Sequence, residues 1–188
     1  NCCDKCRKEF PEMPLVRYAT GGYICTSPFP YDGIFRRAVL NFKFHNCGAY
    51  AEFLSHEMVR SIKDVYRDRE FDLVTCVPMH KDTLRERGYN QAELLAKECA
   101  RLLGIEYADL LAKTKKNKTQ HSIKAAERAK NVIGVYSPID KNLIKGKRIL
   151  IIDDIITTGS TLGECARILN KCKCGEICCC TLCTSLLI

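Results

Sequence analysis

The segment best suited to chemistry is residues 149–161, which reads ILIIDDIITTGST. An apolar strand ends in two adjacent carboxylates, Asp153 and Asp154, and a turn rich in hydroxyl groups follows before a helix. Ligands bind at the carboxyl ends of strands in open α/β sheets. Gly159 lets the backbone approach a ligand closely, and free amides at the start of the helix favour an anion. The second half of the segment therefore predicts a cradle for a phosphate group.

The two carboxylates need a different partner, because like charges repel and a phosphate alone is disfavoured beside them. Their presence indicates a ligand that also offers hydroxyl donors or a cation. A ribose 5-phosphate fits, since Asp153 and Asp154 can accept from its 2′- and 3′-hydroxyls while the loop holds the phosphate. The alternative is structural: the Asp pair caps a turn, and residues 157–161 are an ordinary helix N-cap. The segment is not a Walker loop, because no Gly-Lys-Ser/Thr follows.

Several segments together resemble a known family. Residues 149–161 closely resemble the phosphoribosyl pyrophosphate (PRPP) loop of type I phosphoribosyltransferases. Residues 77–92, VPMHKDTLRERGYNQA, resemble the corresponding stretch of the ComF family, competence-associated proteins with a phosphoribosyltransferase domain. The resemblance covers residues 30–188. Further matches in spacing are Gln120, Arg128 and Asn131, and Lys43 before Gly48.

The resemblance implies an α/β fold: a type I phosphoribosyltransferase-like twisted, mainly parallel sheet flanked by helices, with a small N-terminal Cys-containing hood. Residues 1–30 would form an N-terminal knuckle and hairpin, and residues 31–188 the phosphoribosyltransferase-like domain. It also implies Mg²⁺ and PRPP as ligands. Association of two copies of the chain into a homodimer is a further possibility.

The resemblance also implies roles for individual residues. Asp153 and Asp154 would be the catalytic pair that takes the ribose hydroxyls. The residues assigned to the 5′-phosphate are Thr157, Thr158, Gly159, Ser160 and Thr161. Those assigned to pyrophosphate, in and beside a loop over residues 78–81, are His80, Lys81, Arg85 and Arg87. A mobile loop over residues 113–131 would close over the site with Gln120 and Arg128; it departs from the family at Asn117, where members often carry Thr.

The basic residues also allow plainer interpretations. Lysines 113–118 can be a solvated loop, Arg85 and Arg87 an exposed helix end, and His80 a local hydrogen-bonding side chain. The chain carries a net charge of +8, which fits an anionic partner without choosing between a phosphorylated metabolite, a nucleic acid and an acidic surface.

Two functions follow. The first is an enzyme, a glycosyltransferase in which an unidentified nitrogen acceptor displaces pyrophosphate from PRPP with the help of Mg²⁺. Cations aimed at the leaving group would stabilise the charge that develops there. The second is a non-catalytic accessory protein of DNA uptake or nucleic-acid handling that binds PRPP or a nucleotide as a signal. Binding to DNA phosphates would weaken steeply with added salt.

The 14 cysteines in 188 residues separate into two groups. Cys3 and Cys6 form a C-x-x-C pair, half of a tetrahedral zinc site, and its further ligands could be Cys2, Cys25, His45 or Cys47. ComF proteins often have a four-cysteine zinc module at this position. The second group falls in and before an expected buried strand, where cysteine acts as a small hydrophobe; it comprises Cys172, Cys174, Cys178, Cys179, Cys180 and Cys183.

The elements that must position these residues alternate between strands and helices, which favours a parallel sheet. Strands are expected at residues 71–77, 147–153 and 176–185, and a hairpin at 15–27 with its turn at residues 20–22. Helices are expected at residues 31–44, 50–67, 90–103 and 161–173. No apolar run reaches the roughly 20 residues of a membrane span. With no visible signal peptide, we expect a cytoplasmic protein with reduced thiols.

Overall fold

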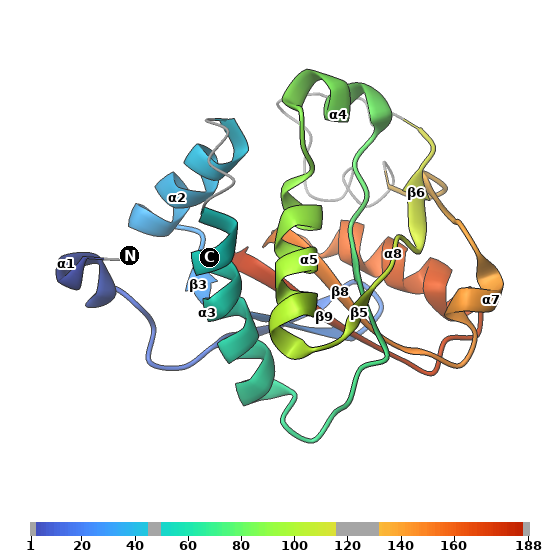
Figure 1. Ribbon diagram of the computed structural model, residues 1–188, viewed down its shortest axis with the longest axis horizontal. Helices are drawn as coiled ribbons and strands as arrows, with labels where there is room; N and C mark the ends of the chain where they lie inside the picture. The colour runs from blue at the N-terminus through green and yellow to red at the C-terminus, as the bar shows by residue number, and fades with distance from the viewer. Residues whose placement is uncertain (1–2, 45–49, 116–131, 186–188) are drawn as a thin grey trace.

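The computed structural model describes residues 3–44, 50–115 and 132–185 (Figure 1). Its centre is a seven-stranded sheet with the order β1-β2-β9-β8-β4-β5, in which β3 also pairs with β9. Only the β1–β2 pair is antiparallel among the pairings of this sheet in the described residues. The expected mainly parallel sheet is confirmed. Its strands are β1 (Leu15–Ala19), β2 (Tyr23–Ser27), β3 (Phe29–Pro30), β4 (Leu73–Cys76), β5 (Glu106–Tyr107), β8 (Arg148–Ile156) and β9 (Glu176–Thr184).

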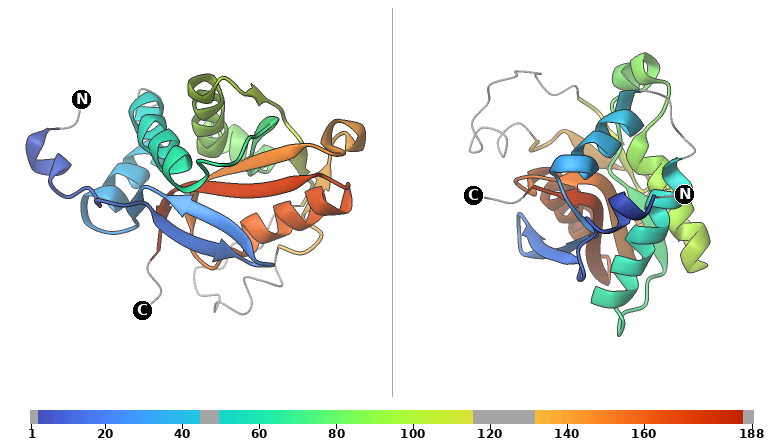
Figure 2. Two further views of the ribbon diagram at one scale, coloured as in Figure 1. Left: turned by 90° about the horizontal axis from the view of Figure 1, so that it is seen from below. Right: turned by 90° about the vertical axis from the view of Figure 1, so that its left-hand side faces the viewer.

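Helices cover both faces of this sheet. Figure 2 (left) shows α3 and α5 on one face and α8 on the other. A separate two-stranded ribbon, β6 with β7, lies beside the sheet. No helix among the described residues is long and apolar enough to cross a bilayer. The remaining elements are α1 (Asp4–Arg7), α2 (Gly33–Phe44), α3 (Tyr50–Val65), α4 (Lys81–Arg87), α5 (Gln91–Leu103), β6 (Leu111–Lys113), β7 (Tyr136–Pro138), α7 (Lys141–Ile144) and α8 (Ser160–Lys171).

Alternation along β8 divides the core between the two faces. Leu150 and Ile152 are fully buried in the cluster formed with α3 and α5, and Ile149 and Ile151 in the cluster formed with α8. Successive side chains of a strand point to opposite faces, so a strand buried on both sides is apolar throughout. The run ILII therefore places β8 in the middle of the sheet, between β9 and β4.

Helix α5 begins and ends where its sequence predicts. The Asn90 side chain accepts a hydrogen bond from the Ala92 amide at 3.1 Å, and Gly104 ends the helix with a φ of +69°. Strand β8, in contrast, is longer than predicted. It continues past Asp153 to Ile156, because its pairing with β9 extends to Ile156 and Thr184. The carboxylates therefore lie within the last part of the strand, whereas the sequence placed its end at Asp153.

The N-terminal hairpin is part of the same sheet, because β2 pairs with β9. Its turn touches the start of α8: the Thr20 amide donates to the Gly159 carbonyl at 3.2 Å. Gly163, one turn into α8, lies so close that a Cβ there would be 2.3 Å from the Thr20 carbonyl oxygen. The division of the chain at residue 30 stays a prediction about sequence segments.

This contact predicts an unusual response to substitution. Gly→Ala inside a helix ordinarily stabilises by about 1 kcal/mol. Gly163→Ala is expected instead to destabilise the protein by about 1–3 kcal/mol, because the methyl group overlaps backbone that must move. Urea unfolding measures the difference, with Lys171→Ala at the exposed end of α8 as the control. A Gly163→Ala protein at least as stable as the wild type would contradict the close docking of the hairpin.

Candidate functional site

The two carboxylates at the end of β8 have different surroundings. Lys43 of α2 forms an ion pair with Asp154, with 2.7 Å between its Nζ and Oδ2. The amide of Asp154 donates to Oδ1 of Asp153 at 2.8 Å. Asp154 is therefore paired with a cation from another element. Both carboxylates line one cavity, and Asp153 also lines a second, smaller pocket. Lys43 entered the sequence analysis only through its spacing, and the structure gives that lysine a partner.

Burial and the neighbouring Asp154 carboxylate raise the pKa of Asp153 to about 8. Both causes disfavour the ionised form in the absence of a ligand. Lys43 and Lys113 act in the opposite direction but are weaker. A ligand or cation that favours the ionised carboxylate would remove this penalty, which is typical of a binding site rather than of a turn cap.

Residues 157–161 form the turn between β8 and α8. A small pocket of about 30 Å³ lies here, lined by Asp153 and by the turn itself. The hydroxyl oxygens of Thr158 and Ser160 are 2.9 Å apart and share a hydrogen bond. Gly159 has a φ of +74°, and a Cβ there would lie 2.7 Å from the Cα of Ala19. A glycine is thus required here because of the positive φ and because the hairpin backbone leaves no room for a Cβ, and not only because a ligand must approach closely.

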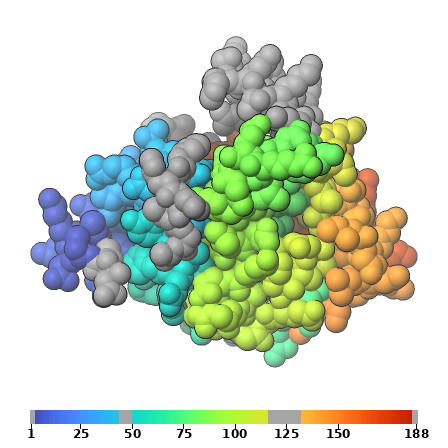
Figure 3. Space-filling model, turned by 45° about the horizontal axis from the view of Figure 1, so that its top comes forward, coloured from blue at the N-terminus to red at the C-terminus, as the bar shows by residue number. Residues whose placement is uncertain are grey.

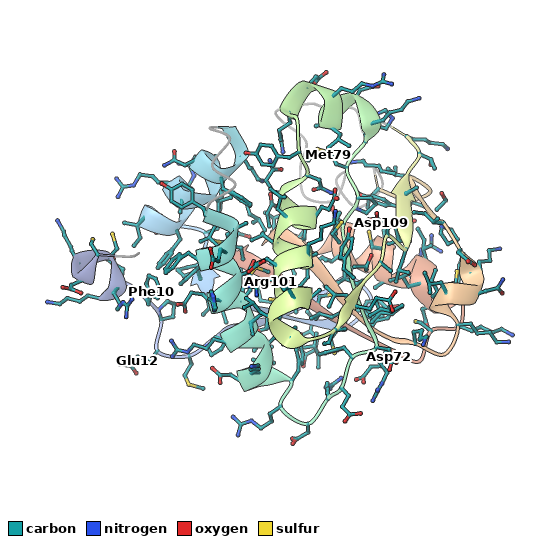
Figure 4. All side chains as sticks on the ribbon, viewed as in Figure 1. Phe10, Glu12, Asp72, Met79, Arg101 and Asp109 are labelled. Atoms are coloured by element: carbon teal, nitrogen blue, oxygen red, sulfur yellow. The ribbon has the colours of Figure 1, made fainter. Side chains whose placement is uncertain are left out.

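A larger cavity of about 220 Å³ opens beside the carboxylates. It lies below α4, where Figure 4 labels Met79 of the β4–α4 loop. Asp153 and Thr161 line both this cavity and the small pocket, so the two are neighbouring parts of one site. The larger cavity is lined by Val77, Pro78, Met79, His80, Thr83, Arg87, Asn90, Gln91, Ala92, Lys113, Tyr136, Asp153, Asp154 and Thr161.

The four residues assigned to pyrophosphate divide between two faces of α4. His80 and Arg87 line the cavity, whereas Lys81 and Arg85 are exposed and do not line it. The reason is helical spacing: His80 and Arg87 share a face with Thr83, and Lys81 and Arg85 share another. His80 also caps the helix, because its Nδ1 accepts from the Asp82 amide at 3.3 Å. His80 is therefore both a local hydrogen-bonding side chain and a residue of the cavity wall. Figure 3 shows α4 on the molecular surface between α2 and the β6 segment.

The opposite wall contains residues that the sequence analysis did not assign. Lys113 of β6 and Tyr136 of β7 line the cavity, with 5.6 Å between the ammonium nitrogen and the ring centroid. Burial lowers the pKa of Lys113, although the Asp153 carboxylate acts against this shift. Lys113 was visible in sequence only as the first of several lysines in a basic stretch. Its pairing with Tyr136 joins residues on either side of the segment 116–131, which no local pattern indicates.

The remaining site predictions concern the N-terminus and the expected loop. Gln120 and Arg128 lie outside the described residues, as do Cys2, His45 and Cys47. In the described part of the chain no group of three or more His, Cys, Asp or Glu side chains could hold a metal ion. Cys25, the remaining candidate ligand, is fully buried and contacts Thr181. The described residues therefore do not support zinc at Cys3 and Cys6.

Four of the six C-terminal cysteines are core residues, as expected, and Cys172 and Cys174 are partly buried against the core. The thiols of Cys178, Cys179, Cys180 and Cys183 are buried in β9, and burial raises the pKa of each. A raised pKa keeps a thiol protonated and unreactive. The structure gives them a packing role.

Comparison with known proteins matches this chain to a family. The family model described as phosphoribosyl transferase domain matches residues 90–186. Competence protein F of Haemophilus influenzae is 31% identical over 180 residues, which cover 93% of this chain and 75% of that protein. Competence protein ComFC of Bacillus subtilis is 31% identical over 152 residues, 80% of this chain and 60% of that protein.

A solved structure shares the fold. The glutamine PRPP amidotransferase from B. subtilis, complexed with ADP and GMP, superimposes with a TM-score of 0.50 and 18% identity. The match covers 75% of this chain and 30% of the amidotransferase chain.

The raised pKa of Asp153 predicts how stability depends on pH. A carboxyl group with a folded pKa of about 8 and an unfolded pKa near 3.9 stabilises the fold below about pH 4, and this contribution is lost as pH rises towards 8. Asp153→Asn is therefore expected to be more stable than the wild type at pH 7–8, by on the order of 4–5 kcal/mol, because each unit of the pKa shift is worth about 1.4 kcal/mol. The difference should shrink towards pH 4.

Urea unfolding at several pH values measures this difference, and Asp68→Asn, at an exposed carboxylate, is the control. If Asp153→Asn is less stable than the wild type at pH 8, Asp153 is a structural residue and the assignment of a strained, ligand-facing carboxylate is wrong.

Proposed function

The chain belongs to the ComF family of competence-associated proteins with a phosphoribosyltransferase domain, and from this premise we propose that it binds PRPP and transfers the phosphoribosyl group to a nitrogen acceptor. The observation that carries the proposal is the position of Asp153 between two pockets. One pocket is formed by residues 157–161, and the other reaches the loop before α4. This arrangement suits a ligand with a phosphate at one end, hydroxyls in the middle and a pyrophosphate at the other end.

In this proposal residues 157–161 hold the 5′-phosphate. Their amides lie at the start of α8, where the helix dipole favours negative charge. Asp153 and Asp154 accept hydrogen bonds from the ribose hydroxyls, which favours the ionised form of Asp153. Lys43 holds Asp154 in place through its 2.7 Å contact. The carboxylate pair thus fixes the ribose rather than attacking it.

The pyrophosphate end lies towards α4. His80 and Arg87 line the cavity there, and Lys113 adds a cation from the opposite wall. Lys81 and Arg85, exposed on α4, add positive potential near the opening. The carboxylate oxygens of Asp153 and Asp154 are hard ligands that suit Mg²⁺. Bound with PRPP, Mg²⁺ would supply charge neutralisation on the pyrophosphate.

The residues can assist the reaction without a protein nucleophile. An acceptor nitrogen attacks the anomeric carbon, and the bond from that carbon to the pyrophosphate oxygen breaks. Positive charge develops on the sugar and negative charge on the leaving group. Arg87 and Lys113 stabilise the leaving group, and the Asp153 and Asp154 carboxylates lie on the sugar side.

A second candidate function is favoured by the names of the relatives. Competence protein F and Competence protein ComFC are named for competence rather than for an enzymatic reaction. The protein would then bind PRPP or a nucleotide as a signal, and its net charge of +8 would serve a nucleic acid or a DNA-uptake partner. Release of pyrophosphate with any member of a panel of nitrogen acceptors supports the enzyme, whereas PRPP binding without turnover supports the accessory protein.

The two functions share one test of the site. We expect calorimetric titration of magnesium PRPP to show binding to the wild type and a Kd about 10- to 100-fold weaker in Asp153→Asn/Asp154→Asn, because hydrogen bonds to ionised acceptors are lost. Asp68→Asn is the control for loss of charge alone. Unchanged affinity in the double variant contradicts the ribose assignment.

Salt-sensitive binding to single-stranded DNA that the double variant retains would place nucleic-acid binding elsewhere on the surface.

A further inference from the structure

One buried polar atom of the cavity is left without a partner. Gln91, the first residue of α5, is 1% exposed and lines the cavity. Its amide nitrogen Nε2 has no hydrogen-bond partner within the described residues. Buried polar groups in native proteins are almost always paired, so an unpaired donor on a residue that lines a cavity indicates a ligand atom that the protein itself does not supply.

The orientation of this amide is fixed by its other end. Nη1 of Arg87 donates to Oε1 of Gln91 at 2.8 Å. If the amide were turned over, two donors would face each other, so the arrangement with Oε1 towards Arg87 is the favourable one. Nε2 is then the amide atom that Arg87 does not engage.

The start of α5 is also held against the loop that precedes α4. The Asn90 side chain donates through Nδ2 to the Val77 carbonyl at 3.2 Å and accepts from the Ala92 amide. Gln91 therefore sits at a defined place relative to the loop that contains His80. Its amide is pre-organised, which lowers the cost of binding a ligand.

The chemistry of the group restricts its partner. Nε2 of an amide is a donor only, so it cannot bind a metal ion and needs an oxygen or nitrogen acceptor. The guanidinium of Arg87 lies beside it, and a donor next to a cation suits an anionic oxygen. Asp153 and Asp154, which line the same cavity, would repel such an oxygen and so favour a position beside Arg87.

We propose that Gln91 and Arg87 form a paired donor site for a phosphoryl oxygen at the pyrophosphate end of PRPP, with Gln91 donating through Nε2. This inference rests on the proposed function, because it names the part of that ligand which Gln91 contacts. The 5′-phosphate is the other possible source of a phosphoryl oxygen, and comparison of ligands distinguishes the two.

The test is titration of three ligands in the presence of Mg²⁺: PRPP, inorganic pyrophosphate and ribose 5-phosphate. Gln91→Glu keeps an acceptor for Arg87 but replaces the donor with negative charge. Gln91→Met keeps the side-chain length and removes both groups. Lys97→Met, at an exposed position of α5, is the matched control.

We expect at least a tenfold weaker Kd for PRPP and for pyrophosphate in Gln91→Glu, a smaller loss in Gln91→Met, and less than a twofold change for ribose 5-phosphate in both. The control should bind like the wild type. Wild-type affinity for pyrophosphate in both Gln91 variants, or an equal loss for all three ligands, overturns the proposal.

A measurement on the wild type covers the case in which the variants do not fold. In a ¹⁵N–¹H spectrum, the side-chain amide signal of Gln91 should shift on addition of magnesium pyrophosphate and not of ribose 5-phosphate. Pyrophosphate binding without PRPP binding would overturn the proposed function and the assignment of this site to PRPP, and would leave Gln91 and Arg87 as a site for a phosphoryl oxygen of pyrophosphate. Absence of pyrophosphate binding to the wild type, or an unmoved Gln91 signal on binding, overturns the inference.

Discussion

Two carboxyl groups held side by side at the end of a buried strand impose the constraint on which the site depends. The β8 backbone fixes Asp153 and Asp154 as neighbours. Its pairing with β4 ends at Ile152, directly before them, and its pairing with β9 continues past them to Ile156, which leaves that backbone little freedom. Their mutual repulsion is relieved only in part, by the ion pair of Lys43 with Asp154 and more weakly by Lys113. The folded chain therefore carries an electrostatic cost that a ligand with hydroxyl groups and an associated cation can relieve. Stability and binding are opposed at Asp153.

The surrounding elements position groups around this pair from four directions. The turn into α8 offers amides and hydroxyls, and the β6–β7 ribbon brings Lys113. The loop before α4 offers His80, α4 itself offers Arg87, and α2 brings Lys43. The N-terminal hairpin acts at a distance from the ligand, because Thr20 packs against Gly159 and Gly163 and sets where α8 begins. A mobile or displaced hairpin would shift the amides at the start of α8. The hairpin therefore belongs to the support of the site although it lines neither pocket.

Much of the frame could be predicted from sequence because its signals are local. The apolar run before Asp153 identifies a central strand, Asn90 and Gly104 mark the ends of α5, and two glycines after Thr20 mark the hairpin turn. The residue at which β8 ends could not be predicted from residue types. The apolar pattern stops at Asp153 and Asp154, but the pairing of β8 with β9 continues to Ile156. Pairing with a distant strand overrides local polarity there.

The site was predicted less completely than the fold, because some of its residues are far apart in the sequence and meet only in the folded chain. Lys113 and Tyr136 meet only because β6 and β7 pair across the segment between them. Lys81 and Arg85 resemble His80 and Arg87 in sequence, and only the helical geometry of α4 separates them. Gln91 gave no chemical signal as a residue type; its unpaired amide is a property of packing.

The most direct measurement is a crystal structure of the protein with PRPP and Mg²⁺. The account predicts ribose hydroxyls within hydrogen-bond distance of Asp153 and Asp154, the 5′-phosphate on residues 157–161, and the pyrophosphate towards His80 and Arg87. A ligand bound in the reverse direction, or one that leaves the two carboxylates without contacts, would contradict it.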